Sequence, residues 1–255
     1  MENSKQRWYS ILFMICLGLL ITSIPFGLFI KNSYLVIILN IITKIAAIIF
    51  VLVYLKKEKI GEIRLTKPKK RDLVFSPFIL LSFTNFIVIF ANQEIMNIKI
   101  DYKSIILNFG FCLLTAVFEE ILFRFVLIKE FHKTNNNLLT IIYSAISFGA
   151  IHLLNIGSIS SILPSLAQVA YTAFLGLILG LIYLFTNNLI YPIVLHFCFN
   201  FFNNTLVTAL YPLKWNLNFF LINIAIGILI FIYAYIIFKF FDKKEDLYAT
   251  KNLDF

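Results

Sequence analysis

The chain has 255 residues, of which 60% are hydrophobic and only 14% are charged, and its mean hydropathy is +0.90. A soluble core of this size cannot enclose so much apolar surface, so the composition indicates a membrane protein and excludes an ordinary soluble domain. The net charge of +9 does not indicate a nucleic-acid partner, because the basic residues gather in loops on one predicted side of the membrane.

The apolar segments predict an all-α, polytopic membrane helical bundle. A bilayer core about 30 Å thick requires roughly 20 apolar residues per helix, which gives about eight transmembrane helices. These are 8–30, 34–55, 73–91, 104–128, 138–154, 159–185, 188–210 and 216–238. We divide the chain into three parts, which are 1–103 with three spans and a basic loop, the core 104–210, and 211–255 with the last span and a tail.

The basic residues predict the orientation of these spans. With the amino terminus inside, 16 lysines and arginines lie on the inner side and only four on the outer side. The largest group is "KKEKIGEIRLTKPKKR", residues 56–71, which we expect to lie on anionic lipid. The positive-inside rule then predicts a multi-pass protein of the cell membrane with cytoplasmic termini.

Ionisable residues are rare inside the predicted spans. Of 13 acidic residues, only Glu119 and Glu120 lie deep in a span, and of three histidines only His152 and His196 lie inside one. Lys44 lies midway along the second span. A charged group at the bilayer centre costs at least ~2.5–3.5 kcal/mol on insertion scales, so such residues are functional-site hypotheses. For Lys44 the sequence leaves open pairing with a glutamate or lining a cavity.

Local spacing separates the two glutamates. Glu120 stands four residues before Arg124, so the two side chains share a helix face and are expected to form an ion pair. Glu119 has Phe123 at the equivalent position and so has no partner nearby in the sequence. A buried carboxylate without a partner is disfavoured unless function retains it. We therefore expect Glu119 to act in chemistry and Glu120 to support it, although a purely structural role for Glu120 and Arg124 stays open.

Three motifs occur in order, each on a separate predicted span. They are "EEILFR" (119–124), "FGAIH" (148–152) and "HFCFN" (196–200). Over about residues 104–205 this set resembles the CAAX protease and bacteriocin-processing (CPBP or Abi) family of intramembrane proteases. The resemblance implies a peptide hydrolase whose catalytic core is 104–210 and whose substrate is a membrane-embedded or membrane-associated polypeptide.

The resemblance also implies roles for the motif residues. Glu119 and His152 would activate a water molecule, and His196 with Asn200 would bind the oxyanion. Phe148 is expected to be a packing residue. The candidate catalytic residues are Glu119, Glu120, Arg124, His152, His196 and Asn200.

The sequence requires no cofactor but leaves a divalent metal such as zinc open. Glu119, His152 and His196 would be the ligands, because two histidines and a glutamate match a catalytic zinc site. A His-Glu-x-x-His helix is missing from the sequence, and Asn200 beside His196 suits an oxyanion donor better than a zinc ligand. We therefore expect zinc to be weakly bound or absent.

Two other classes of function remain as alternatives. A proton-coupled transporter would use the same residues as a relay, but inverted repeats, which are common in transporters, are not evident in the sequence. A non-enzymatic immunity protein would keep the fold, although every motif position here is filled. For the enzyme, bacteriocin or pheromone processing and self-immunity are both open. Expected partners are the polypeptide substrate and the lipid bilayer, with no nucleic acid.

Overall fold

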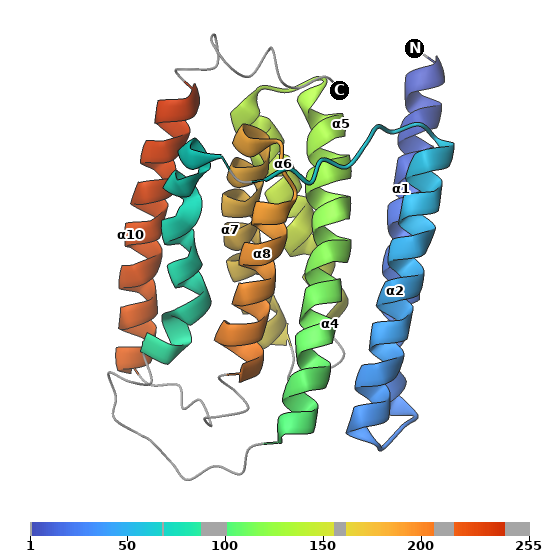
Figure 1. Cartoon of the computed structure of the whole chain (residues 1–255), viewed down its shortest axis with the longest axis vertical. Coiled ribbons are helices and arrows are strands. Elements are labelled where there is room, and N and C mark those ends of the chain that lie inside the picture. Colours follow the sequence, from blue (N-terminus) through green and yellow to red (C-terminus); the bar gives the residue numbers. More distant parts are fainter. Residues whose placement is uncertain (1, 68, 88–100, 156–161, 207–216, 243–255) are drawn as a thin grey trace.

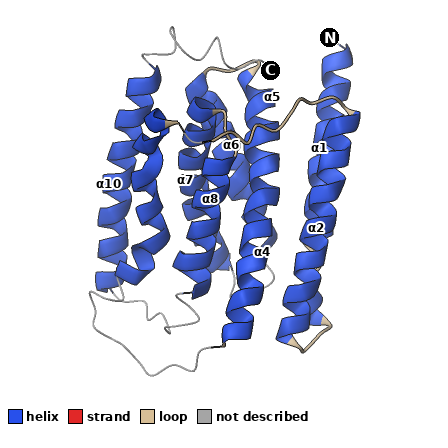
Figure 2. Cartoon of the chain, in the orientation of Figure 1, coloured by secondary structure: helices blue, strands red, loops and turns tan. Residues whose placement is uncertain are grey.

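The computed structural model describes residues 2–67, 69–87, 101–155, 162–206 and 217–242. These residues form helices and connecting loops without a strand (Figure 2), which confirms the predicted all-α class. The helices are α1 (Glu2–Thr22), η1 (Phe26–Leu28), α2 (Ser33–Lys57), η2 (Lys70–Phe83), α4 (Tyr102–Glu120), η3 (Ile121–Ile128), α5 (Lys129–His132), α6 (Asn137–Ala150), η4 (Ile151–Asn155), α7 (Ile162–Thr186), α8 (Ile190–Cys198), η6 (Phe199–Leu206) and α10 (Leu217–Asp242).

Five helical stretches of the described residues are long and apolar enough to cross a membrane. They are Gln6–Leu28, Ser33–Lys57, Asn137–Leu154, Gln168–Thr186 and Ala225–Asp242. A polytopic helical membrane bundle is therefore confirmed. The other three predicted spans coincide with η2, with α4 and η3, and with α8 and η6, which are also helical. Because these three do not meet the same length and hydropathy criteria, the number eight stays a prediction.

The helices are arranged in three groups (Figure 1). Helices α1 and α2 pack together as an N-terminal hairpin at one edge of the bundle, and α2 packs on α4. The middle group contains α4, α6, α7 and α8, with α6 packed along α7. At the opposite edge, α10 and η2 lie side by side, as the Tyr233 hydroxyl donates to the backbone oxygen of Val74. The motif-bearing helices therefore lie in the middle of the bundle.

An extended segment, residues 58–67, crosses one end of the bundle between α2 and η2 (Figure 1), and we call it the strap. Its backbone accepts hydrogen bonds at Arg64 O from the Leu189 amide (3.2 Å) and at Thr66 O from Asn188 Nδ2 (2.7 Å). Ile60 is buried. Much of the basic loop is therefore held against the protein. Contact of its exposed side chains with anionic lipid stays a prediction, as does the orientation of both termini.

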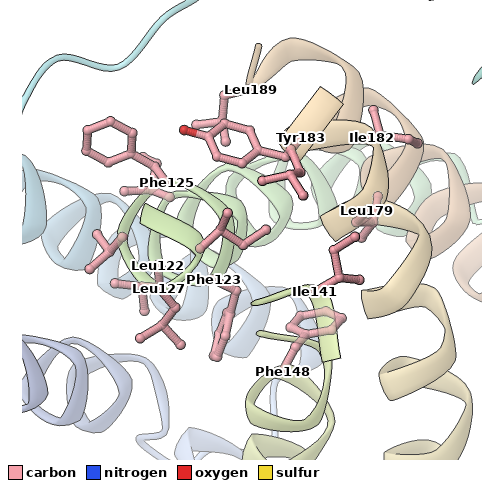
Figure 3. Close-up of a cluster of buried hydrophobic side chains, with 14 of the residues drawn as sticks. Leu122, Phe123, Phe125, Leu127, Ile141, Phe148, Leu179, Ile182, Tyr183 and Leu189 are labelled. Carbon is pink, nitrogen blue, oxygen red and sulfur yellow. The ribbon is translucent and has the colours of Figure 1, made fainter. Parts of the chain in front are cut away.

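Among the segments whose burial the structure describes, η3 is the best covered. All eight of its residues are buried, between α6 and α7 among other elements. Figure 3 shows side chains of η3 meeting Ile141 and Phe148 of α6 and Leu179 of α7. The rings of Phe123 and Phe148 meet edge to face with centroids 5.3 Å apart. The segment that reads in sequence like a lipid-facing helix is thus enclosed by protein, and the acidic pair lies at its start.

Candidate active site

Two helices change their winding at the motifs. Helix α4 passes into the π-helical segment η3 directly after Glu120, and α8 passes into the π-helical segment η6 two residues after His196. Asn200 lies in η6. π-Helical turns are rare and frequently mark functional sites. Both segments lie next to the polar residues that the sequence singles out.

Glu120 is fully buried and has two partners. Its Oε1 lies 2.7 Å from His196 Nδ1, and its Oε2 lies 3.1 Å from Arg124 Nε. The ion pair predicted from the four-residue spacing is therefore present. This contact is an ion pair without a hydrogen bond, because neither Glu120 Oε2 nor Arg124 Nε makes an aligned hydrogen bond within the described residues. Arg124 also donates from Nη2 to Gly176 O (3.4 Å) and lies over the Phe148 ring, 4.4 Å from its centroid.

Glu119 is held less tightly than Glu120 and is partly accessible. Its side chain is 10% exposed, whereas that of Glu120 is 0% exposed. Glu119 Oε2 lies 3.7 Å from His196 Nε2, and Glu119 Oε1 lies 4.0 Å from Lys44 Nζ. The imidazole of His196 thus has a carboxylate beside each of its nitrogens. Lys44 belongs to none of the three motifs, and the structure places it beside a glutamate. Its position midway along an apolar span was the feature of the sequence that drew attention to it.

His152 is linked to the same cluster through the ring of Phe148, which contacts both histidines. It lies in the 3-10 segment η4, is half-buried, and its Nδ1 is 3.1 Å from the backbone oxygen of Phe148. The Phe148 ring packs edge to face against His152 (5.6 Å) and against His196 (5.4 Å). Within the described part of the chain, no hydrogen bond or ion pair joins His152 to Glu119 or Glu120. The structure therefore gathers the two histidines around one buried phenylalanine.

Asn200 and Asn203 have different environments in η6. Asn200 is half-buried, one turn after His196, and among the described residues no hydrogen bond ties its amide to the acidic pair. Asn203 is buried, and its Oδ1 accepts hydrogen bonds from Thr84 Oγ1 (2.9 Å) and from the Asn85 amide (2.8 Å). The sequence analysis did not single out Asn203, although a polar amide side chain inside an apolar span was a feature that could have marked it. It ties η6 to the end of η2.

The residues that the sequence left open as zinc ligands do not meet as a set. Within the residues that the structure describes, no three histidine, cysteine, aspartate or glutamate side chains are placed to hold a metal ion. Nδ1 of His196 faces Glu120, and Nδ1 of His152 faces the Phe148 carbonyl. As placed, Glu119, His152 and His196 do not fit a three-ligand site. Weak or absent zinc binding stays a prediction, and we assign no step to a metal.

Comparison with known proteins identifies a family for the motif-bearing part of the chain. Residues 101–202 match a family model described as Rce1-like, type II CAAX prenyl endopeptidase Rce1-like. The match contains all three motifs and confirms the resemblance to the CAAX protease family over this segment. A search of curated proteins and a search of solved structures gave no match. The N-terminal hairpin, η2 and α10 lie outside the matched residues.

Proposed function

Because residues 101–202 match the Rce1-like family of CAAX-type endopeptidases, we propose that this chain is an intramembrane endopeptidase that hydrolyses a peptide bond of a membrane-associated polypeptide. The observation that carries the proposal is the position of the His196 imidazole between two carboxylates. Glu120, fully buried, lies at Nδ1, and Glu119, partly exposed, lies near Nε2. This arrangement supports different tasks for the two adjacent glutamates.

Glu120 acts as the support. Its carboxylate accepts the hydrogen bond from His196 Nδ1, and this contact orients the ring so that Nε2 is directed toward Glu119. Arg124 balances the charge of Glu120 at 3.1 Å. A fully enclosed carboxylate with these partners has no room to meet a substrate, but it holds the imidazole in one orientation, as a catalytic group requires.

Glu119 acts as the general base. Its carboxylate takes a proton from a water molecule, and the water oxygen adds to the carbonyl carbon of the scissile peptide bond. The family resemblance assigns His152 a share in activating this water. The protonated base then supplies the proton that the leaving amine needs. The partial exposure of Glu119 supports this role, because the base must meet water.

His196 and Asn200 stabilise the oxyanion. With Nδ1–H donated to Glu120, Nε2 carries a proton only when the ring is an imidazolium, so His196 donates to the oxyanion as a cation. Asn200 stands four residues later on the same helix face and adds an amide donor. Donors fixed in a site with little water stabilise developing negative charge strongly.

The experiment uses the purified full chain in liposomes with membrane-anchored peptides. One set of peptides carries an isoprenylated cysteine near the carboxyl terminus, and a second set has the same sequences on a transmembrane anchor. Mass spectrometry of the products should show defined fragments with the wild type and none with Glu119→Gln. The set that is cleaved identifies the class of anchor.

Equal fragment yields from the wild type and Glu119→Gln would contradict the proposal. Proton flux into wild-type liposomes without any fragment would support the transporter alternative instead. For the biological role, we propose processing of a bacteriocin or peptide pheromone, or self-immunity, which the family resemblance supports. Cleavage of such precursor peptides in the same assay tests this part.

A further inference from the structure

Lys44 is a buried lysine in a membrane span, and it lies outside the residues that match the family model. It stands midway along α2 and is 8% exposed. An ammonium group at this depth is costly unless it has a counter-charge or a function. Its neighbours belong to the end of α4, where Nζ lies 4.0 Å from Glu119 Oε1 and 5.0 Å from the centroid of the Phe118 ring.

Lys44 places a positive charge beside Glu119 that does not depend on the protonation of His196. Arg124 lies against Glu120, and the two form a neutral pair at 3.1 Å. This leaves Glu119, whose nearest basic side chains are Lys44 and the His196 ring. Whenever the His196 imidazole is neutral, the ammonium of Lys44 is the charge that compensates an ionised Glu119. A general base must be ionised before it can accept a proton.

The two oxygens of Glu119 face different partners. Oε1 is directed toward Lys44 and Oε2 toward His196 Nε2. The carboxylate is therefore held between a group on α2 and a group on α8, and turning it would change both contacts. Orienting a reacting group in this way lowers the entropic part of an activation barrier.

The position of Lys44 is set by contacts at both ends of the N-terminal hairpin. At one end, the Tyr34 hydroxyl at the start of α2 donates to Asp101 Oδ2 (2.8 Å), next to the start of α4. At the other end, Arg7 Nη2 of α1 donates to Glu130 Oε1 of α5 (2.9 Å). These contacts fix the register of the hairpin along the Rce1-like domain, and this register puts Lys44 at the depth of Glu119.

We propose that Lys44 is a positioning residue for peptide hydrolysis. Its ammonium orients and counterbalances the Glu119 carboxylate, so that the N-terminal hairpin completes the active site of the Rce1-like domain. The inference rests on the proposed role of Glu119 as the base. It assigns a function to a part of the chain that carries none of the three motifs.

The kinetic test compares three variants in the liposome assay. Lys44→Met removes the charge and keeps an unbranched side chain, Lys44→Arg restores a charge, and Lys56→Met makes the same change at an exposed lysine in the last turn of α2. We expect Lys44→Met to lower kcat by about 10- to 100-fold with little change in KM, as for a misplaced catalytic group. Lys44→Arg should restore most of the loss, and Lys56→Met should match the wild type.

A thermal-unfolding cycle tests the coupling between Lys44 and Glu119. Lys44→Met should lower the Tm of the wild type, because it leaves Glu119 without its counter-charge. In the Glu119→Gln background the same substitution should raise the Tm, because it removes an unpaired buried lysine. Additive changes in the four proteins would overturn the proposal.

The kinetic outcomes separate this proposal from the proposed function. An unchanged kcat in Lys44→Met, or a loss that Lys44→Arg fails to restore, would overturn the positioning role. If Glu119→Gln is inactive while Lys44→Met is fully active, only the role of Lys44 fails. If Glu119→Gln cleaves as fast as the wild type, the proposed function fails as well.

Discussion

Helix α2 and segment η3 have similar apolar sequences but opposite surroundings. In η3 every residue is buried, including Arg124. In α2 the burial follows one stripe with a spacing of three or four residues, as expected for a helix that packs on one side. The stripe consists of Lys44, Ala47, Val51 and Leu55. Large apolar residues such as Ile42 and Ile49 on the rest of α2 are exposed.

The comparison shows what apolar character indicates in a membrane bundle. Hydropathy does not tell whether a side chain faces lipid or protein, because both surroundings accept leucine and isoleucine. A charged residue does indicate the side that faces protein, because a charge is stable in a span only where other protein groups pair with it. Lys44 on α2 and Arg124 in η3 both lie on the protein-facing side, next to Glu119 and Glu120 respectively. Substitutions that change these charges, or the ties between the two regions, test the comparison.

The largest expected effect is on catalysis at the acidic pair. Glu119→Gln should lower the rate of peptide cleavage by at least ~10³-fold, since a glutamine has no basic oxygen to take the proton. Its Tm should fall by only a few degrees, because the amide has nearly the same shape as the carboxylate although Lys44 loses its counter-charge. Cleavage kinetics and thermal unfolding in detergent measure the two quantities.

Glu120→Ala is the contrasting variant. It should lower the free energy of unfolding by roughly 3–5 kcal/mol, because it leaves Arg124 buried without its partner. The division of roles is wrong if Glu119→Gln keeps near-normal turnover. It is also wrong if Glu120→Gln eliminates turnover with unchanged stability, and then the two roles are exchanged.

A smaller effect separates the two asparagines of η6. Asn203→Ala should lower the free energy of unfolding by about 1–3 kcal/mol, because it leaves the Asn85 backbone amide without its acceptor and leaves Thr84 Oγ1 only the backbone oxygen of Leu81. Turnover per folded molecule should be retained. The matched variant Asn200→Ala should lower turnover by about 10²-fold with little loss of stability, since it removes an oxyanion donor. The reverse pattern would make Asn203 the functional amide.

The strap begins directly after α2 and passes beside Lys129, the residue that follows η3, so it offers a test of how the two regions meet. Gly61 has φ +105°, and a Cβ at this position would collide with Lys129 Nζ. Gly61→Ala should therefore lower the free energy of unfolding by about 1 kcal/mol, which is typical of a side chain forced into this backbone region. Gly27→Ala is the control, because nothing lies within 4 Å of a Cβ there. Equal unfolding midpoints in denaturant for both variants would show that the strap is not held as described.

The smallest effect is expected at Asp101, where α2 meets the start of α4. Hydrogen bonds from the Ser104 amide and the Tyr34 hydroxyl lower the pKa of Asp101 below its usual 3.8. A lowered carboxyl pKa stabilises the folded state fully above the unfolded pKa, and this stabilisation disappears as pH falls through the folded pKa. Asp101→Asn should therefore lower the Tm slightly at neutral pH and not at pH below the folded pKa. A difference that persists in acid would exclude this linkage.

Patterns within single helices were predictable from the sequence. The residues of all eight predicted spans that the structure describes are largely helical, because apolar runs of sufficient length favour helices in a bilayer. The contact between Glu120 and Arg124 follows from a spacing of four residues. The three motifs indicated the family that the comparison with known proteins then matched to residues 101–202.

Contacts between helices were not predictable in the same way. The family resemblance paired His152 with Glu119 and His196 with Asn200, yet of the two histidines only His196 contacts the glutamates among the described residues, and Phe148 packs against both rings. The side of a helix that meets its neighbour depends on the rotation and depth of both helices. The spacing of residues within one helix gives neither the rotation nor the depth of that helix relative to its neighbour.

The sequence by itself determined that this protein is a helical membrane bundle with an acidic pair, two histidines and an arginine inside its spans. Hydropathy and insertion cost act on each residue separately, so they can be read from one chain. Only the tertiary structure decided that His196 lies between Glu119 and Glu120 and that Lys44 faces Glu119 from α2. These contacts join elements more than 70 residues apart, and they form because packing fixes the register between helices that have no sequence relation to each other.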